Sequence, residues 1–84
     1  TRLFTEYTMD EVTLTLSRNG VGQLLDGIDV LIEQWEATAE YLDTGRIRED
    51  VCLRESHSLH EAEAIAEIYR QLRDRIWEQL PVRQ

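Results

Sequence analysis

The sequence predicts a small α+β domain that is mostly helical, with an N-terminal β-strand or hairpin followed by an antiparallel pair of helices. Two observations lead to this fold class. Apolar residues recur at three-to-four spacing through most of the chain, and a short alternating run of apolar and polar residues precedes them. With 84 residues the chain is sized for one domain, 1–84, in which residues 1–17 form the strand or hairpin.

The β-strand prediction rests on a period of two. Val12, Leu14 and Leu16 alternate with threonines, as in a half-buried strand. Within residues 3–9 the apolar residues occupy the opposite parity, so the register breaks just after them. A turn at the break would make a hairpin, whereas a bulge would leave one long strand whose edge must pair with another subunit.

A long amphipathic helix is predicted over residues 18–43. Ser17 can cap its start, and Gly45 suits the left-handed conformation at its end. Gly22 and Gly27 weaken its first half; we interpret them as points where the two helices pack closely, although they could also admit another backbone. Its apolar residues share one face: Val21, Leu24, Leu25, Ile28, Leu31, Ile32, Trp35, Ala39 and Leu42.

A second helix is predicted over residues 58–80, after a connection of residues 44–57. Ser58 and Glu61 have the spacing of a capping box, and Pro81 cannot continue the helix. The apolar side of this helix is wider than one partner helix covers. Its two rows are Ile65, Ile68, Leu72 and Ile76, and Ala62, Ala66, Tyr69, Trp77 and Leu80.

Self-association is expected from this excess of apolar surface. A chain of this size buries a small core, and its one cysteine cannot form an internal disulfide. We therefore predict a homodimer with a four-helix arrangement and a small shared sheet. Trp35 and Trp77 are interpreted as anchors of the core or of the dimer interface.

Six carboxylates form a second pattern on the first predicted helix, where their three-to-four spacing makes one acidic stripe. The stripe consists of Asp26, Asp29, Glu33, Glu36, Glu40 and Asp43. It could simply be solvated and paired with Arg70 and Arg73, or it could be presented to a basic protein. A further uncharged face of Val30, Gln34, Ala37 and Tyr41 could dock a partner.

Composition limits the function classes. The chain has 17 acidic residues against 9 basic ones, all of them arginine, and a net charge of −8, which argues against nucleic-acid binding. No apolar run reaches the roughly 18 residues of a membrane span, and no signal pattern is present, so we expect a cytoplasmic protein.

A chemical role has one candidate group of residues. Cys52, His57 and His60 could serve a small enzyme or a metal-binding protein, but convincing third and fourth metal ligands are missing. We therefore predict a non-enzymatic interaction module, an acidic adaptor or inhibitor, that needs no cofactor. The enzyme or metal protein is the alternative.

Overall fold

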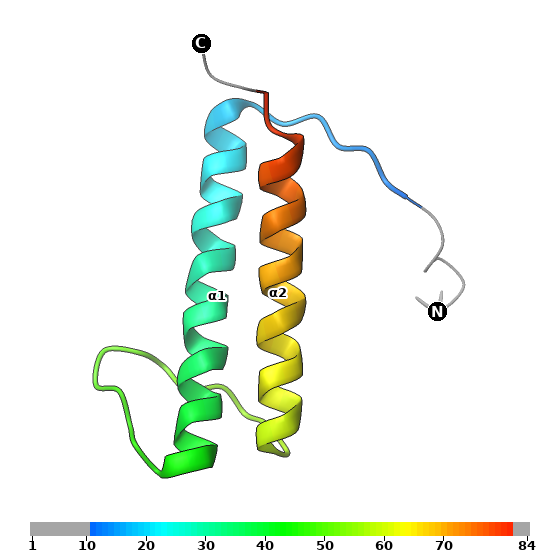
Figure 1. Cartoon of the computed structure of the whole chain (residues 1–84). Helices are drawn as coiled ribbons and strands as arrows, with labels where there is room; N and C mark the ends of the chain where they lie inside the picture. Colours follow the sequence, from blue (N-terminus) through cyan, green and yellow to red (C-terminus); the bar gives the residue numbers. More distant parts are fainter. Residues whose placement is uncertain (1–10, 82–84) are drawn as a thin grey trace, which may run out of the picture.

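The computed structural model describes residues 11–81, which form an antiparallel hairpin of two helices (Figure 1). Helix α1 spans Arg18–Thr44 and helix α2 spans Leu59–Gln79. At 1.5 Å per residue they are about 40 Å and 31 Å long, so α2 lies beside most of α1. The helical hairpin predicted from the sequence is confirmed, and each helix bound falls within one residue of its expected position.

The ends of α1 are fixed by local hydrogen bonds. The Ser17 side chain accepts a hydrogen bond of 3.0 Å from the Gly20 amide at the helix start. At the other end Gly45 adopts a φ of 79°, and its amide donates to the Tyr41 carbonyl at 2.8 Å. A left-handed residue at this point favours glycine because a Cβ would be strained there. Both capping predictions for α1 are confirmed.

The core is centred on one indole. Trp35 of α1 is buried against Ala62 and Ala66 of α2, and Ile65 and Tyr69 pack around this cluster. The two alanines have small side chains, so the backbone of α2 can come close to the tryptophan. Towards the start of α1 the core continues through Leu25, Ile28 and Ile32, all of which are buried.

The connection between the helices folds back along α1 (Figure 1). Thr38 is buried, with only 2% of its surface exposed. Its hydroxyl donates a hydrogen bond to the Gln34 carbonyl at 2.8 Å and accepts one from the Arg54 amide at 2.7 Å. The Arg54 guanidinium donates to the Gln34 side chain at 3.2 Å and lies 5.8 Å from the centre of the Trp35 ring. Residue 54 is thus held against the C-terminal half of α1.

The predicted β-strand is wrong for residues 11–17, the part of it that the structure describes. Residues 11–17 are extended but form no β-strand, and residues 11–81 contain no sheet, so the α+β class and the shared sheet are overturned. A strand requires hydrogen bonds to a neighbouring strand, and every other described segment is helix or connection. The alternation of Val12, Leu14 and Leu16 therefore corresponds to an extended chain without strand pairing. The part of the prediction for residues 1–10 lies outside the described residues.

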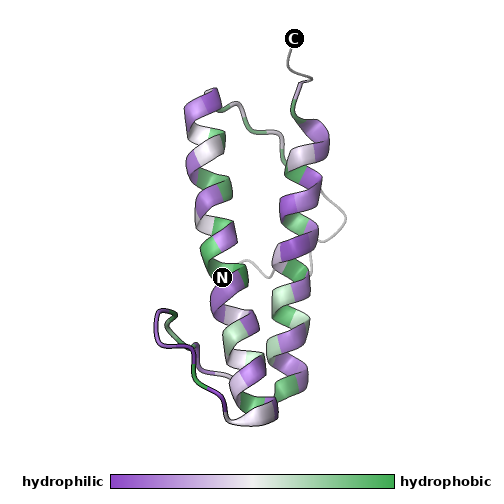
Figure 2. Cartoon of the chain, turned by 60° about the vertical axis from the view of Figure 1, so that its left-hand side comes forward, coloured by the Kyte–Doolittle hydropathy of each residue, from purple (hydrophilic) through white to green (hydrophobic). Residues whose placement is uncertain are grey.

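Several large apolar side chains remain on the surface of the hairpin. In Figure 2 apolar positions recur along both helices, including on sides that the other helix does not cover. Ile68 is 61% exposed and Trp77 is 58% exposed, so Trp77 is not a core anchor of the single chain, in contrast to Trp35. A Cβ added at Gly22 or Gly27 would meet nothing within 4 Å. Our interpretation of these glycines as points of close packing between α1 and α2 is therefore wrong.

We predict that Thr38→Val destabilises the fold by about 1 to 3 kcal/mol, because it leaves the Arg54 amide without its acceptor in a partly buried setting. Thr44→Val is the matched control, since the Thr44 hydroxyl donates to Glu40 and accepts from Arg46 in the same pattern but in an exposed position. Thr44→Val should change the free energy of unfolding by no more than about 0.5 kcal/mol. Urea unfolding measures both; equal losses would refute the assigned role of Thr38.

Candidate protein interaction surface

Two acids of the predicted stripe face α2 and are paired there. Arg70 lies 3.1 Å from Glu36, and Arg73 lies 3.6 Å from Asp29. Arg70 also contacts Glu67 of its own helix at 2.7 Å. The expectation that Arg70 and Arg73 reach across to the stripe is confirmed. These contacts define what we call the ion-pair flank of the hairpin.

Glu40 is paired with the connection instead. Its carboxylate lies 2.7 Å from Nε of Arg48 and 3.3 Å from Arg46, and the hydrogen bond to Glu40 raises the pKa of Arg48. The spacing of the stripe alone does not predict these two partners. One feature of the sequence indicates this pairing. Arg46 and Arg48 follow Gly45 directly, where the chain reverses and passes the last turns of α1.

The other three acids of the stripe are exposed, and Asp43, although in line with Asp29 and Glu36, lies in the last turn of α1. Asp26, Glu33 and Asp43 are exposed, and none of them forms an ion pair within residues 11–81. Asp26 and Glu33 are seven residues apart, so they lie on one line along α1, two turns from each other. We call these three residues the outward acids. Within the described residues, the single stripe of the sequence is therefore divided into three paired acids and three unpaired ones.

The second predicted face is changed by the connection. Val30 and Tyr41 are exposed, Gln34 is partly exposed, and Ala37 is completely buried. Residue 54 is bonded to Thr38 and Gln34, on the turns next to Ala37. Ala37 is thus not accessible to a partner in this conformation, and the exposed part of this face consists of Val30 and Tyr41.

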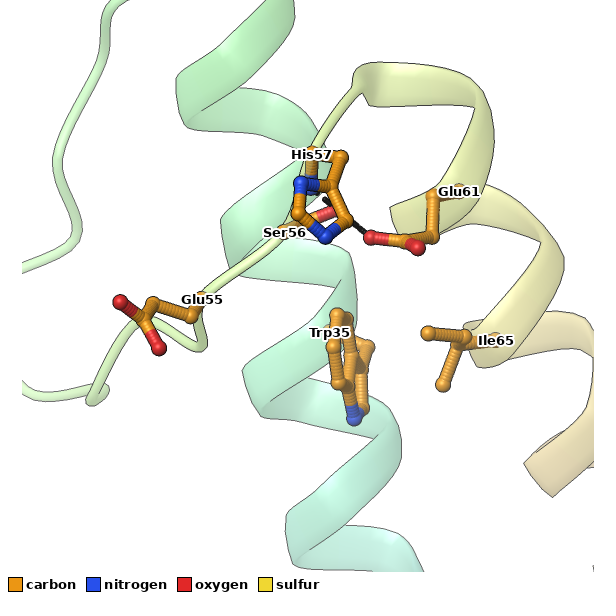
Figure 3. Close-up of a pocket in the computed structure, with 6 residues that line it drawn as sticks. All are labelled: Trp35, Glu55, Ser56, His57, Glu61 and Ile65. Atoms are coloured by element: carbon orange, nitrogen blue, oxygen red, sulfur yellow. Dashed lines mark hydrogen bonds between the residues drawn. The ribbon is translucent and has the colours of Figure 1, made fainter.

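A hollow of about 420 Å³ lies between α1 and the start of α2 (Figure 3). It is lined by Trp35, Glu55, Ser56, His57, Glu61 and Ile65. Glu61 accepts hydrogen bonds from the His57 amide at 2.8 Å and from the Ser56 hydroxyl at 2.9 Å. These two bonds, the backbone one foremost, lower the pKa of Glu61.

Glu61 therefore has a structural task at the start of α2. Its amide donates to the Ser58 side chain at 3.1 Å, as the capping box predicts, but its carboxylate reaches past Ser58 to the amide of His57. The carboxylate consequently fastens the end of the connection to the helix start.

Cys52, His57 and His60 do not form a metal-binding cluster in the described residues. Cys52 is exposed, and within residues 11–81 no group of three or more His, Cys, Asp or Glu side chains is placed to hold a metal ion. The contact that the structure records for His57 is made by its backbone amide. The geometry thus gives no specific support to a site of Cys52, His57 and His60.

Comparisons with known proteins identify no relative. A scan against protein-family models, a search of curated protein sequences and a search of solved structures each found no match. In the described part of the chain, neither helix has the combination of length and apolar character that crossing a membrane requires. The function is therefore argued from the surfaces of the hairpin.

We predict that Glu61→Gln lowers the melting temperature at pH 7. The pKa of Glu61 lies below its ordinary value of 4.5 in the folded state, so its ionised form stabilises the fold above that pH and the contribution is lost as the pH falls through the folded-state pKa. The difference between wild type and variant should narrow below about pH 4.5.

Thermal melts between pH 7 and pH 3 test this expectation. Glu63→Gln is the control, because Glu63 lies two residues further along the same helix turn, is exposed and forms no ion pair in the described residues. A deficit for Glu61→Gln that stays constant across the pH range would show that its charge has no part in the cap.

Proposed function

We propose that this chain is a non-enzymatic protein interaction module that acts as a homodimer and presents its outward acids to a basic protein. The observation that carries the proposal is the exposure of Asp26, Glu33 and Asp43 on a helix whose other stripe acids are occupied by arginines of the same chain. The internal arginines neutralise the inner part of the stripe. The outward part keeps an uncompensated negative field.

The chemistry of the partner follows from that field. Exposed carboxylates attract lysine and arginine side chains and speed up encounters between the two proteins, while each rim contact adds modest affinity. The chain as a whole carries a net charge of −8, so an acidic partner would be repelled. We therefore propose a basic partner, bound in a salt-sensitive manner, with Val30 and Tyr41 as neighbouring apolar contacts.

Two further features support the proposal. The Glu61 carboxylate in the hollow of Figure 3 is bonded to the cap of α2, which gives it a structural role consistent with a contact module. Cys52 is an exposed free thiol, which suits a reducing compartment, and we place the module in the cytoplasm. The homodimer rests on the exposed apolar side chains of the hairpin, Ile68 among them.

We predict that the double variant Asp26→Lys/Glu33→Lys loses capture of basic proteins while its melting temperature changes little, because both side chains are exposed and project away from α2. The matched control is Asp29→Lys/Glu36→Lys, which changes the charge equally and has the same seven-residue spacing. It should lower stability by about 1 to 2 kcal/mol, since it replaces two cross-helix ion pairs with repulsion.

Affinity capture from native lysate, quantified by mass spectrometry at two salt concentrations, compares wild type with both variants. We expect that the proteins no longer captured by Asp26→Lys/Glu33→Lys are basic, and that Asp29→Lys/Glu36→Lys still captures most of them. Equal losses with both variants would show that only net charge matters, and unchanged capture by the outward variant would show that the outward acids are not a contact surface.

A further inference from the structure

The hairpin has a second flank, opposite the ion pairs, on which each helix contributes a row of uncharged residues. On α1, Leu24, Gly27 and Leu31 follow one another at steps of three and four, so they lie in one row. On α2, Ile65, Ile68, Leu72 and Ile76 form the corresponding row. We call these two rows the uncharged flank.

Two hollows show that these rows share one side of the hairpin. Leu24 of α1 lines a hollow together with Leu72 and Ile76 of α2, and Ile65 lines the hollow of Figure 3 with Trp35. The ion pairs of Arg70 and Arg73 join the other sides of the same helices, as the helical spacing requires. The cross-helix ion pairs and the two apolar rows thus lie on opposite flanks, and charged residues of the connection and of the start of α2 line only the hollow of Figure 3 beside the apolar rows.

The exposed area of this region is large enough for a dimer. Six exposed side chains contribute to it: Val12, Leu14, Leu16, Leu24, Ile68 and Leu72. Their exposed fractions run from 42% at Leu24 to 82% at Val12, which leaves apolar surface on the order of several hundred Å². A standard interface buries about 800 Å² on each partner, with apolar atoms forming about two thirds of a homodimer interface. A second copy is therefore sufficient to cover it.

The extended segment before α1 adds to the same region. Val12, Leu14 and Leu16 line a hollow of about 470 Å³ with Leu24 and Leu72. Their exposed fraction falls from 82% at Val12 to 48% at Leu16, as the chain approaches the helices. Within the described residues nothing fills the space between this segment and the hairpin completely, so an apolar partner can enter from the uncharged flank.

Gly27 supplies an independent observation. A glycine in the middle of a long helix lowers helix stability, and here no side chain or backbone of the same chain uses the space beside it. It lies in the uncharged row between Leu24 and Leu31, where a residue without a side chain lets another helix come close. Gly22 is equally open, but its hollow is shared with Trp77 and Arg18 and belongs to the ion-pair side.

Charge favours this flank over the other as the place where a second copy binds. Two chains of net charge −8 repel one another, and the repulsion is least when their acidic stripes point away from each other. Contact through the uncharged flank places the ion-pair flanks of both copies on the outside. A two-fold axis through this flank also brings equal apolar rows together, as an isologous interface requires.

We propose that a second copy of this chain packs on the uncharged flank, with Gly27 of α1 at the closest helix approach, and that the two hairpins complete a four-helix bundle. The proposal deepens the homodimer of the proposed function by naming its interface and rests on that function. It leaves the outward acids of both copies accessible to a basic partner.

The test compares the full chain with Gly27→Leu and with Gly22→Leu as the matched control. Both variants remove a helix-weakening glycine from an open position, so both should keep the helical circular dichroism of wild type. Sedimentation equilibrium at micromolar concentrations should give twice the chain mass for wild type. Gly27→Leu should raise the dimer dissociation constant roughly 10- to 100-fold through overpacking, and Gly22→Leu should change it within about threefold.

A third variant, Trp77→Ala, distinguishes the two flanks, since Trp77 is exposed on the other side of α2 and should leave the dimer intact. A wild-type dimer that survives Gly27→Leu, or that dissociates with Gly22→Leu or Trp77→Ala, overturns the uncharged-flank interface while the homodimer stands. A monomeric wild type overturns the interface and the homodimer together, whereas capture of basic proteins is measured separately and is unaffected by that result.

Discussion

The burial of Trp35 against Ala62 and Ala66 is the contact on which the rest of the hairpin depends. A large indole opposite two small side chains brings the helices close at the end where the chain reverses. The same indole supports the guanidinium of Arg54, whose amide is held by Thr38. Helix pairing and the path of the connection therefore share one centre, and both would be altered by any change in the size of the residue at position 35.

Close pairing also sorts the polar residues. Once Trp35 and the alanines fix which sides of α1 and α2 meet, helical geometry places Glu36 opposite Arg70 on one flank and the apolar rows on the other. The individual ion pairs are partly exposed and contribute little to stability. Their larger effect is on specificity, because they occupy the inner acids and leave the outward ones as the negative surface of the hairpin.

The sequence was sufficient for features that depend on neighbours along the chain. The spacing of apolar residues predicted both helices, and Ser17, Gly45 and Ser58 marked their ends because a cap is a local hydrogen-bonding requirement. The sequence was insufficient for features that depend on contact with a segment far away along the chain. The alternation around Leu14 could not reveal whether a partner strand exists, and the periodicity of α1 could not reveal that the connection returns over the helix and buries Ala37. The outward acids were predicted as part of a stripe. Which acids of the stripe are paired could be seen only once the positions of Arg48, Arg70 and Arg73 in the fold were known.

The position of Cys52 has a practical consequence. It is the one cysteine of the chain, it is exposed, and it lies in the connection two residues before Arg54, the residue that is bonded to Thr38. A thiol-reactive fluorophore would therefore attach at a single known point, without entering either helix or the apolar core. Opening and closing of that segment could then be followed in real time from dye emission, against the fixed reference of the buried indole nearby.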